Sequence, residues 1–225
     1  MNSYKCGDFE VANITQRNIE KVISQMPVNS FTIAINAEKI IQINENENFR
    51  KLVSESYVNF VDGVMAISLV KKFNKDVHLQ KIDMPSNVIS FALKSKKTIA
   101  LIGGHIEIVT AAAKRLESMG LVVSEFSHGY VSDEELIKTL RYINADYTLL
   151  ALGSPRQEYI ASEATKIGCR TRIIPCGGAI DIIGGAKKRA PIWVQHFRCE
   201  FLYRLLTDPS RFKRYMKILR VFKYV

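Results

Sequence analysis

Short apolar runs alternate along this chain with longer segments whose apolar positions recur at helical spacing. Runs of four to six β-branched or other apolar residues bounded by turn residues indicate buried strands, and the longer periodic segments indicate amphipathic helices. The expected strands cover 31–35, 57–61, 98–102, 121–126, 147–152 and 172–175, and the expected helices cover 37–44, 47–56, 64–73, 86–95, 107–119, 132–143 and 156–167. This alternation predicts an α/β fold with a Rossmann-like, mostly parallel sheet and helices on both faces.

Polar residues and glycines follow the predicted strands at their carboxyl ends, where parallel sheets bind ligands. They are Asn36, Asp62-Gly63, Gly103-Gly104, Gly153-Ser154 and Gly177-Gly178. Glycine lets the backbone approach a ligand closely, and the helix N-termini that follow present amide donors to phosphate. Any one pair could equally be a plain turn, but the repetition favours a ligand-binding crevice at this edge.

The positive charge of the protein is concentrated at its C-terminal end. The chain has a net charge of +10, and residues 186–225, with eleven Lys or Arg and two acids, account for +9 of it. Within 210–225 the apolar and basic positions fall on opposite sides of a predicted helix. A basic amphipathic helix suits an anionic membrane surface, although packing on the domain with a solvated basic face is the alternative. A second function class, nucleic-acid binding through this tail, also stays open.

The sequence lacks the motifs that are typical of several other functional classes. The Gly103-Gly104 segment has neither GxGxxG nor a following acidic residue, which argues against a redox dinucleotide enzyme, and there is no P-loop or Asp-x-Asp. His105, His128 and the cysteines show no metal-ligand spacing, so no metal and no cofactor are expected, and the four cysteines are expected to be reduced and buried. Without signal-peptide features or an apolar run near the ~20 residues that span a bilayer, a cytoplasmic, soluble or peripheral protein is expected.

Seven short motifs occur in one order along most of the chain. They are Asn36-Ala37-Glu38-Lys39, Asp62-Gly63-Val64, Gly103-Gly104, Gly153-Ser154-Pro155-Arg156-Gln157-Glu158, Gly177-Gly178-Ala179-Ile180-Asp181, Lys188-Arg189-Ala190-Pro191 and Glu200-Phe201-Leu202-Tyr203-Arg204. From about residue 30 to about 220 the chain resembles the WecG/TagA/CpsF family of bacterial glycosyltransferases.

The resemblance implies an inverting, metal-independent enzyme that uses a UDP-sugar, commonly UDP-N-acetylmannosamine or its uronic acid. The implied acceptor is N-acetylglucosamine on undecaprenyl diphosphate, in the synthesis of teichoic acid linkage units, enterobacterial common antigen or exopolysaccharide. The amino-acid sequence of the C-terminal tail is most similar to that of the N-acetylmannosaminuronyl transferases within this family. The implied partners are therefore the donor, the lipid-linked acceptor and the anionic inner face of the cell membrane, with no nucleic acid; a homo-oligomer stays open.

Asp62 matches the catalytic base of that family. Inversion needs a carboxylate that takes the proton from the acceptor hydroxyl as its oxygen attacks the anomeric carbon. An Asp-Gly pair after a strand can also be a simple turn.

The resemblance assigns further residues to the substrates. The donor residues are Asn36, Gly103, Gly104, Gln157, Gly177, Gly178, Asp181 and Arg189, and the residues for the acceptor diphosphate are Arg204, Arg211 and Arg214. Gln157 could instead be a polar helix start, Asp181 a cap and Arg189 a surface charge. The expected division is a nucleotide-sugar-binding core over 1–195 and an acceptor- and membrane-binding appendage over 196–225.

Two positions depart from the family pattern. Ala34 stands where a Thr or Ser is usual, and Lys81 is the nearest equivalent of a usual Arg. Lysine supplies charge without the bidentate fork of arginine. These departures concern the contacts to the donor.

Overall fold

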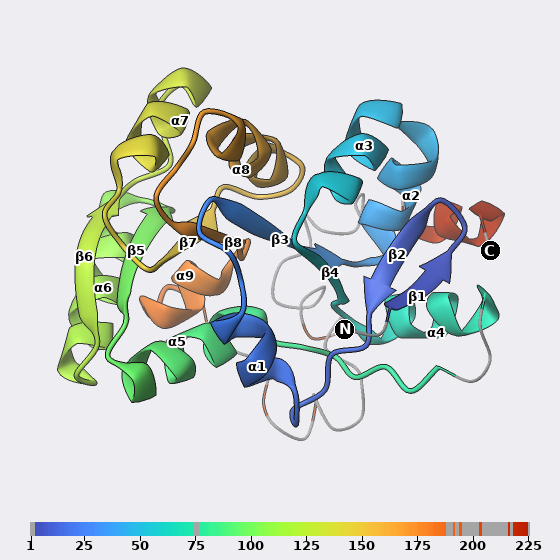
Figure 1. Cartoon of the computed structure of the whole chain (residues 1–225), viewed down its shortest axis with the longest axis horizontal. Coiled ribbons are helices and arrows are strands. Elements are labelled where there is room, and N and C mark those ends of the chain that lie inside the picture. The colour runs from blue at the N-terminus through green and yellow to red at the C-terminus, as the bar shows by residue number, and fades with distance from the viewer. Residues whose placement is uncertain are drawn as a thin grey trace.

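The computed structural model describes residues 3–73, 77–187, 191, 194, 203, 216 and 218–224. Within them a six-stranded sheet runs in the order β4-β3-β8-β7-β5-β6, and every pairing in it is parallel (Figure 1). Its strands are β3 (Ser30–Ile35), β4 (Val58–Val61), β5 (Thr98–Gly103), β6 (Val122–Ser127), β7 (Tyr147–Ala151) and β8 (Arg172–Pro175). The predicted Rossmann-like parallel sheet is confirmed.

Helices cover both faces of the sheet, as predicted (Figure 1). One face carries α2 (Ala37–Glu45), α3 (Glu47–Glu55), α7 (Asp133–Tyr142) and α8 (Arg156–Lys166), and the other carries α1 (Ile19–Ser24), α5 (Met84–Ser95), α6 (Ile106–Ser118) and α9 (Ala179–Ile183). Along β5 the side chains alternate between two hydrophobic clusters: Ala100 and Ile102 join the first, Ile99 and Leu101 the second. Because both faces are covered, the central strands β5 and β7 are mostly apolar, which made them visible in the sequence. The edge strand β6 is mostly exposed and includes Glu125.

Side-chain caps set several of the helix boundaries. Asn46 lies between α2 and α3, and its side chain accepts a hydrogen bond from the Phe49 backbone N–H. The Ser132 hydroxyl accepts from the Glu135 N–H at the start of α7, and Asp83 caps α5 in the same way. These caps satisfy amide donors that the first helical turn leaves without partners.

The N-terminal thirty residues contain elements that no sequence pattern predicted. The strands β1 (Ser3–Cys6) and β2 (Phe9–Ala12) form an antiparallel hairpin, and β2 packs beside the edge strand β4. Helix α4 (Val64–Phe73) contacts both β1 and α2 at this side of the molecule. The hairpin buries Cys6, Phe9 and Val11 in the first hydrophobic cluster. It therefore extends the core and covers part of an edge strand.

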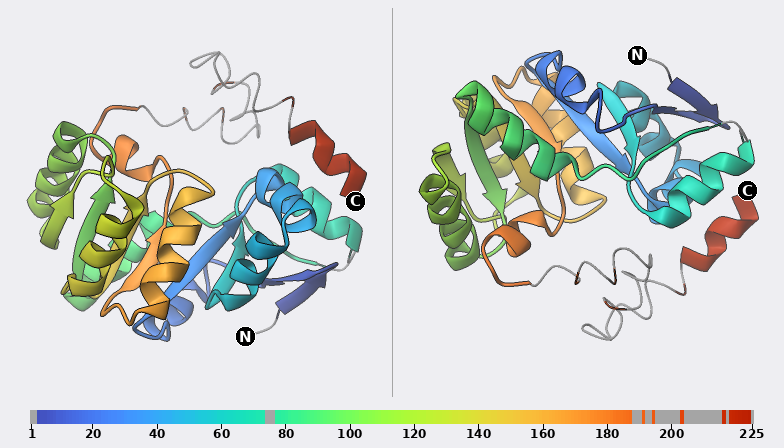
Figure 2. Two further views of the ribbon diagram at one scale, coloured as in Figure 1. Left: turned by 90° about the horizontal axis from the view of Figure 1, so that it is seen from above. Right: turned by 90° about the horizontal axis from the view of Figure 1, so that it is seen from below.

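The last described segment is attached to the body. The 3-10 helix η2 (Leu219–Tyr224) lies against α2, as Figure 2 shows. Val221 is buried, and Arg220 Nη2 lies 2.6 Å from Glu45 Oε1, which also accepts a hydrogen bond from the Tyr224 hydroxyl. Most of the predicted appendage lies outside the described residues, so its division from the core stays a prediction.

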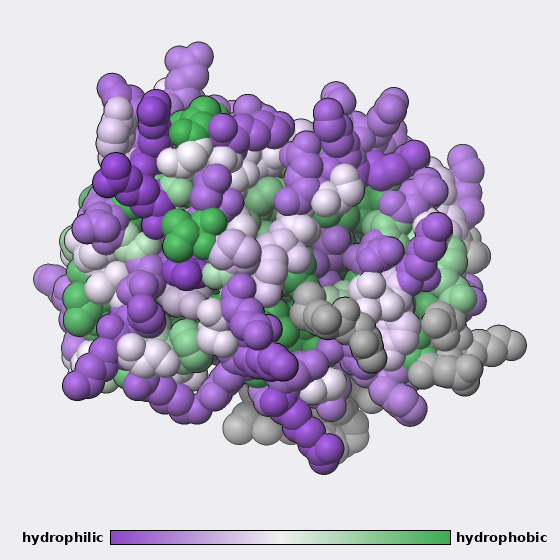
Figure 3. All heavy atoms as spheres, viewed as in Figure 1, coloured by the Kyte–Doolittle hydropathy of each residue, from purple (hydrophilic) through white to green (hydrophobic). Residues whose placement is uncertain are grey.

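Two surface features bear on the predicted location. Among the described residues there is no helix with the length and apolar character needed to cross a membrane. On the face shown in Figure 3, hydrophobic side chains occur in small groups among hydrophilic ones.

The cysteines Cys6 and Cys169 are free and buried, whereas Cys176 is free but only partly buried.

Candidate functional site

Asn36 and Asp62 directly follow two neighbouring strands, β3 and β4, at the same edge of the sheet. Ile35 at the end of β3 pairs with Val61 at the end of β4, and the Asp62 N–H donates to the Ile35 carbonyl over 2.8 Å. Both side chains are partly exposed. The Asn36 Oδ1 accepts from the Lys39 N–H at 3.0 Å and so caps α2. The structure thus brings together the two polar residues that the sequence placed at separate strand ends.

The segment that carries Lys81 lies next to the end of β4. The Ile82 N–H donates to the carbonyl of Val61 over 3.4 Å, and Ile82 itself is buried. Lys81 is exposed. Because Val61 directly precedes Asp62, this cationic residue lies in the chain segment next to Asp62.

The glycines after β5 permit a close approach of two strand ends. Gly103 has φ +128°, and a Cβ atom built on it would lie 2.2 Å from the Ala151 carbonyl oxygen at the end of β7. Gly104 is different, because a Cβ there would lie 3.7 Å from Asp181 Oδ1. The packing of β5 on β7 therefore requires glycine at 103, whereas position 104 lies beside a carboxylate.

The carboxylate of Asp181 lies near both the loop that follows β5 and the loop that follows β8. A Cβ built on Gly178 would lie 3.8 Å from its Oδ2, so the carboxylate is near both Gly104 and Gly178. Asp181 also forms an ion pair with Lys187. Cys176 directly follows β8, and although the residue is partly exposed, burial of its thiol group, reinforced by the negative charges of Asp181 and Asp83, raises the pKa of this thiol, so that it stays protonated.

Gln157 is buried, with 4% of its surface exposed, and its amide is held at both ends. Its Oε1 accepts from the Gly177 N–H at 3.0 Å, and its Nε2 donates to Glu158 Oε1 at 2.7 Å. The same Glu158 oxygen lies 2.6 Å from Lys39 Nζ on α2. This buried chain links the starts of α2 and α8 to the loop after β8.

The sequence interpretation included Gln157 but missed Lys39 and Glu158. Both stand inside motifs that carried the resemblance, Asn36-Ala37-Glu38-Lys39 and Gly153-Ser154-Pro155-Arg156-Gln157-Glu158. Two ionisable residues at apolar helix positions were a usable signal, because charged residues are rarely fully buried unless they are paired.

An aromatic pair lies beside the glycine loop of β5. The rings of His105 and Tyr130 stack at 4.4 Å between centroids, the Tyr130 hydroxyl lies 3.0 Å from His105 Nε2, and Tyr130 is 65% exposed. The Gly129 N–H donates to the Gly104 carbonyl. Sequence reasoning considered His105 only as a metal ligand and missed this exposed aromatic surface.

The guanidinium of Arg156 holds the loop that carries Tyr130. Its Nη1 donates to the Gly129 carbonyl at 3.0 Å, its Nη2 to the Val131 carbonyl at 2.7 Å, and its Nε lies 2.7 Å from Asp133 Oδ1. Three contacts from one rigid fork fix the loop after β6 against the start of α8.

Some predicted residues are not placed. Arg189, Arg204, Arg211 and Arg214 lie outside the described residues. In the part of the chain that the structure describes, no three His, Cys, Asp or Glu side chains gather closely enough to ligate a metal ion.

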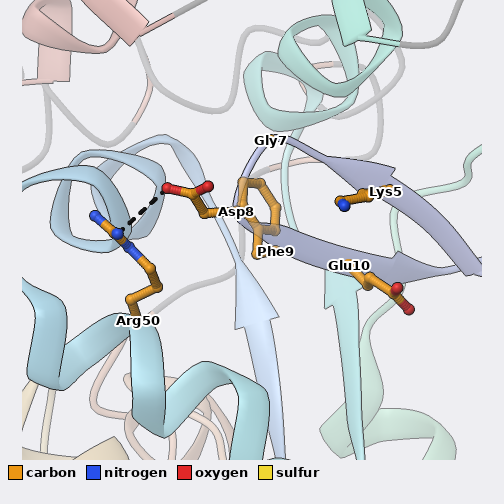
Figure 4. Close-up of a pocket in the computed structure, with 6 residues that line it drawn as sticks. All are labelled: Lys5, Gly7, Asp8, Phe9, Glu10 and Arg50. Carbon is orange, nitrogen blue, oxygen red and sulfur yellow. Dashed lines mark ion pairs between the residues drawn. The ribbon is translucent and has the colours of Figure 1, made fainter.

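A separate hollow lies at the N-terminal hairpin (Figure 4). It is lined by Lys5, Gly7, Asp8, Phe9, Glu10 and Arg50. Asp8 and Arg50 form an ion pair across it, with 3.3 Å between Oδ2 and Nη1. None of the strand-end residues lines this hollow, so we place the candidate site at the carboxyl ends of the strands instead.

Comparison with known protein families identifies the family of the whole chain. The family model described as glycosyl transferase WecG/TagA/CpsF family matches residues 4–225, which is nearly the whole chain. The motifs that form the strand-end site lie inside the matched region. The chain therefore belongs to the WecG/TagA/CpsF family of glycosyltransferases.

Proposed function

We propose that the protein is an inverting, metal-independent glycosyltransferase that uses a UDP-sugar. Its donor is UDP-N-acetylmannosamine or the corresponding uronic acid, and its acceptor is N-acetylglucosamine on undecaprenyl diphosphate. The observation that carries the proposal is the placement of Asp62 beside Asn36 at the same sheet edge as the glycine loops, in a chain of this family.

The nucleotide and its diphosphate fit the loops after β5, β7 and β8. The helices α6 and α8 begin there without a side-chain cap hydrogen bond, so their first-turn amides have no capping side chain. Such amides bind phosphate oxygens well. Asp181 lies between Gly104 and Gly178, where its carboxylate can accept from ribose hydroxyls, and the exposed Tyr130 ring offers a face on which a base can stack.

Asp62 supplies the base for the transfer. It takes the proton from the acceptor hydroxyl while that oxygen attacks the anomeric carbon on the side opposite to UDP. The new glycosidic bond forms as the bond to the β-phosphate oxygen breaks, and UDP leaves with both electrons of that bond. Asn36, next to Asp62, can donate to sugar oxygens through its amide nitrogen. Arg189 neutralises charge on the leaving diphosphate.

The basic tail supplies the acceptor side of the site. Arg204, Arg211 and Arg214 bind the lipid diphosphate, and the +9 charge of 186–225 attracts the anionic inner face of the cell membrane. The two described ends of this segment support the assignment: Lys187 contacts Asp181, and η2 packs on α2, the helix that Asn36 caps. The basic segment thus begins beside Asp181, and its end contacts α2 at Glu45, the end of the helix opposite to Asn36.

A titration of UDP into the protein in the presence of EDTA tests the donor half of this proposal. We expect UDP and the matching UDP-sugar to bind and ADP to bind more weakly, because the proposed donor is a UDP-sugar. Equal binding of ADP, or binding of UDP only when a divalent ion is added, would contradict the proposed donor site.

A further inference from the structure

Lys39 and Glu158 form an ion pair that is removed from water. Their side chains are 3% and 0% exposed, with 2.6 Å between Nζ and Oε1. Burying both charges costs several kcal/mol per ion, and a well-packed apolar pair often gives equal or greater stability. Stability alone therefore does not explain why two charges occupy this place.

The hydrogen bonds of the pair point to a different role. Glu158 Oε1 accepts from Lys39 and also from Gln157 Nε2 at 2.7 Å. A glutamine amide has two orientations that exchange its oxygen and nitrogen. A carboxylate only accepts hydrogen bonds, so Glu158 requires the nitrogen of Gln157 on its side. The Gln157 oxygen then faces the Gly177 N–H, which it meets at 3.0 Å.

We propose that Lys39 and Glu158 are positioning residues that fix the Gln157 amide and, through it, the Gly177-Gly178 loop of the donor site. Lys39 holds Glu158 in an ion pair inside the core, Glu158 selects the orientation of Gln157, and Gln157 holds the Gly177 amide at the end of β8. The importance of this loop for the donor rests on the proposed function, whereas the orientation of Gln157 does not.

A matched pair of double variants separates positioning from packing. Lys39→Met with Glu158→Gln and Lys39→Met with Glu158→Leu both remove the two charges together, so neither leaves a buried charge without a partner. The Gln side chain at 158 can still accept from Gln157 Nε2, but the Leu side chain cannot. Thermal unfolding of both variants verifies that each one folds.

The first readout is the hydrogen-exchange rate of the Gly177 amide, which needs no substrate. We expect exchange in the Leu variant to be about fivefold faster than in the Gln variant, since one hydrogen bond is worth roughly 1 kcal/mol. The second readout is the donor KM, which we expect to rise about tenfold in the Leu variant only, with kcat less affected.

The outcomes distinguish the two proposals. Equal Gly177 exchange rates in the Leu variant and the wild-type protein would overturn the positioning role. If the wild-type protein transfers no sugar, the proposed function fails, but the exchange rates still decide whether Lys39 and Glu158 orient Gln157. Unequal exchange together with an unchanged donor KM would overturn the connection of this loop to the donor.

Discussion

The backbone N–H of Asp62 donates to the carbonyl of Ile35 across 2.8 Å, and this bond aligns the ends of β3 and β4. Because the two strands are parallel and in register up to this point, Asp62 and Asn36 follow them at the same edge of the sheet. A carboxylate and an amide so placed can act on one substrate from adjacent loops.

Replacing Asp62 by Asn removes the proposed base and keeps the shape of the side chain. We expect the transfer rate to fall by a factor of about 100 or more, the usual contribution of a general base, while the affinity for UDP stays within about threefold of the wild type. Asp8→Asn is the matched control, because Asp8 pairs with Arg50 in the hairpin hollow away from the strand ends. Transfer by Asp62→Asn at the rate of the control would remove Asp62 from the mechanism.

Replacing Gly103 by Ala tests the close approach of β5 and β7. The new Cβ atom would lie 2.2 Å from the Ala151 carbonyl oxygen, in a backbone conformation that L residues rarely adopt. Gly120→Ala is the control, because Gly120 has φ +89° but no atom within 4 Å of its Cβ position. Urea unfolding should show a loss of about 1–2 kcal/mol for Gly120→Ala and a clearly larger loss for Gly103→Ala. Equal losses would show that strain in φ, not the contact with Ala151, explains the glycine.

The carboxylate of Asp146 should make stability depend on pH. Burial raises its pKa, but hydrogen bonds from Thr98 and the contact with Lys97, at 3.1 Å, outweigh this and lower the pKa below its ordinary value. An acidic group whose pKa is lower in the folded than in the unfolded protein stabilises the folded state at pH values above the unfolded-state pKa. This stabilisation is lost as the pH falls through the folded-state pKa. Asp146→Asn should therefore destabilise the protein by about 1 kcal/mol near pH 7.

Urea unfolding of Asp146→Asn and the wild type at several pH values measures this. The difference between the two proteins should shrink as the pH falls below about 4, the ordinary range of an aspartate. A difference that stays constant down to pH 2 would mean that the carboxylate charge does not stabilise the fold.

The contact between Glu45 and η2 should hold the C-terminal end on α2. Glu45 accepts hydrogen bonds from both Arg220 and Tyr224. The hydrogen bond between Tyr224 and Glu45 raises the pKa of the Tyr224 hydroxyl. Glu45→Gln removes the charge that Arg220 meets, so limited trypsin digestion near the C-terminus should become about threefold faster or more. Glu47→Gln, two residues further on in α3, is the control. Equal cleavage rates in both variants would show that the contact with Glu45 does not hold this end.

The central strands were predictable because β5 is buried on both faces and reads as an uninterrupted apolar run. Asn36 and Asp62 were predictable as strand-end residues for the same reason. Their neighbours were harder to predict, because the contact of Gln157 with Gly177 and of Glu158 with Lys39 depends on β8 lying between β3 and β7. Local patterns do not encode that strand order.

The short elements were missed for a different physical reason. The strands of the hairpin are only four residues long, and β1 is mostly polar, so neither one shows a clear alternation. Helix α9 has five residues, fewer than two turns, and its stability comes from packing of Ile180 in the core.

Acceptor-dependent release of UDP tests the central claim most directly. The wild-type protein would be incubated in EDTA with a panel of UDP-sugars, with and without a polyprenyl-diphosphate N-acetylglucosamine analogue in vesicles. We predict that UDP is released from one donor, UDP-N-acetylmannosamine or its uronic acid, and only when the acceptor is present. Release from no donor, with vesicles and acceptor supplied, would contradict the proposed transfer reaction.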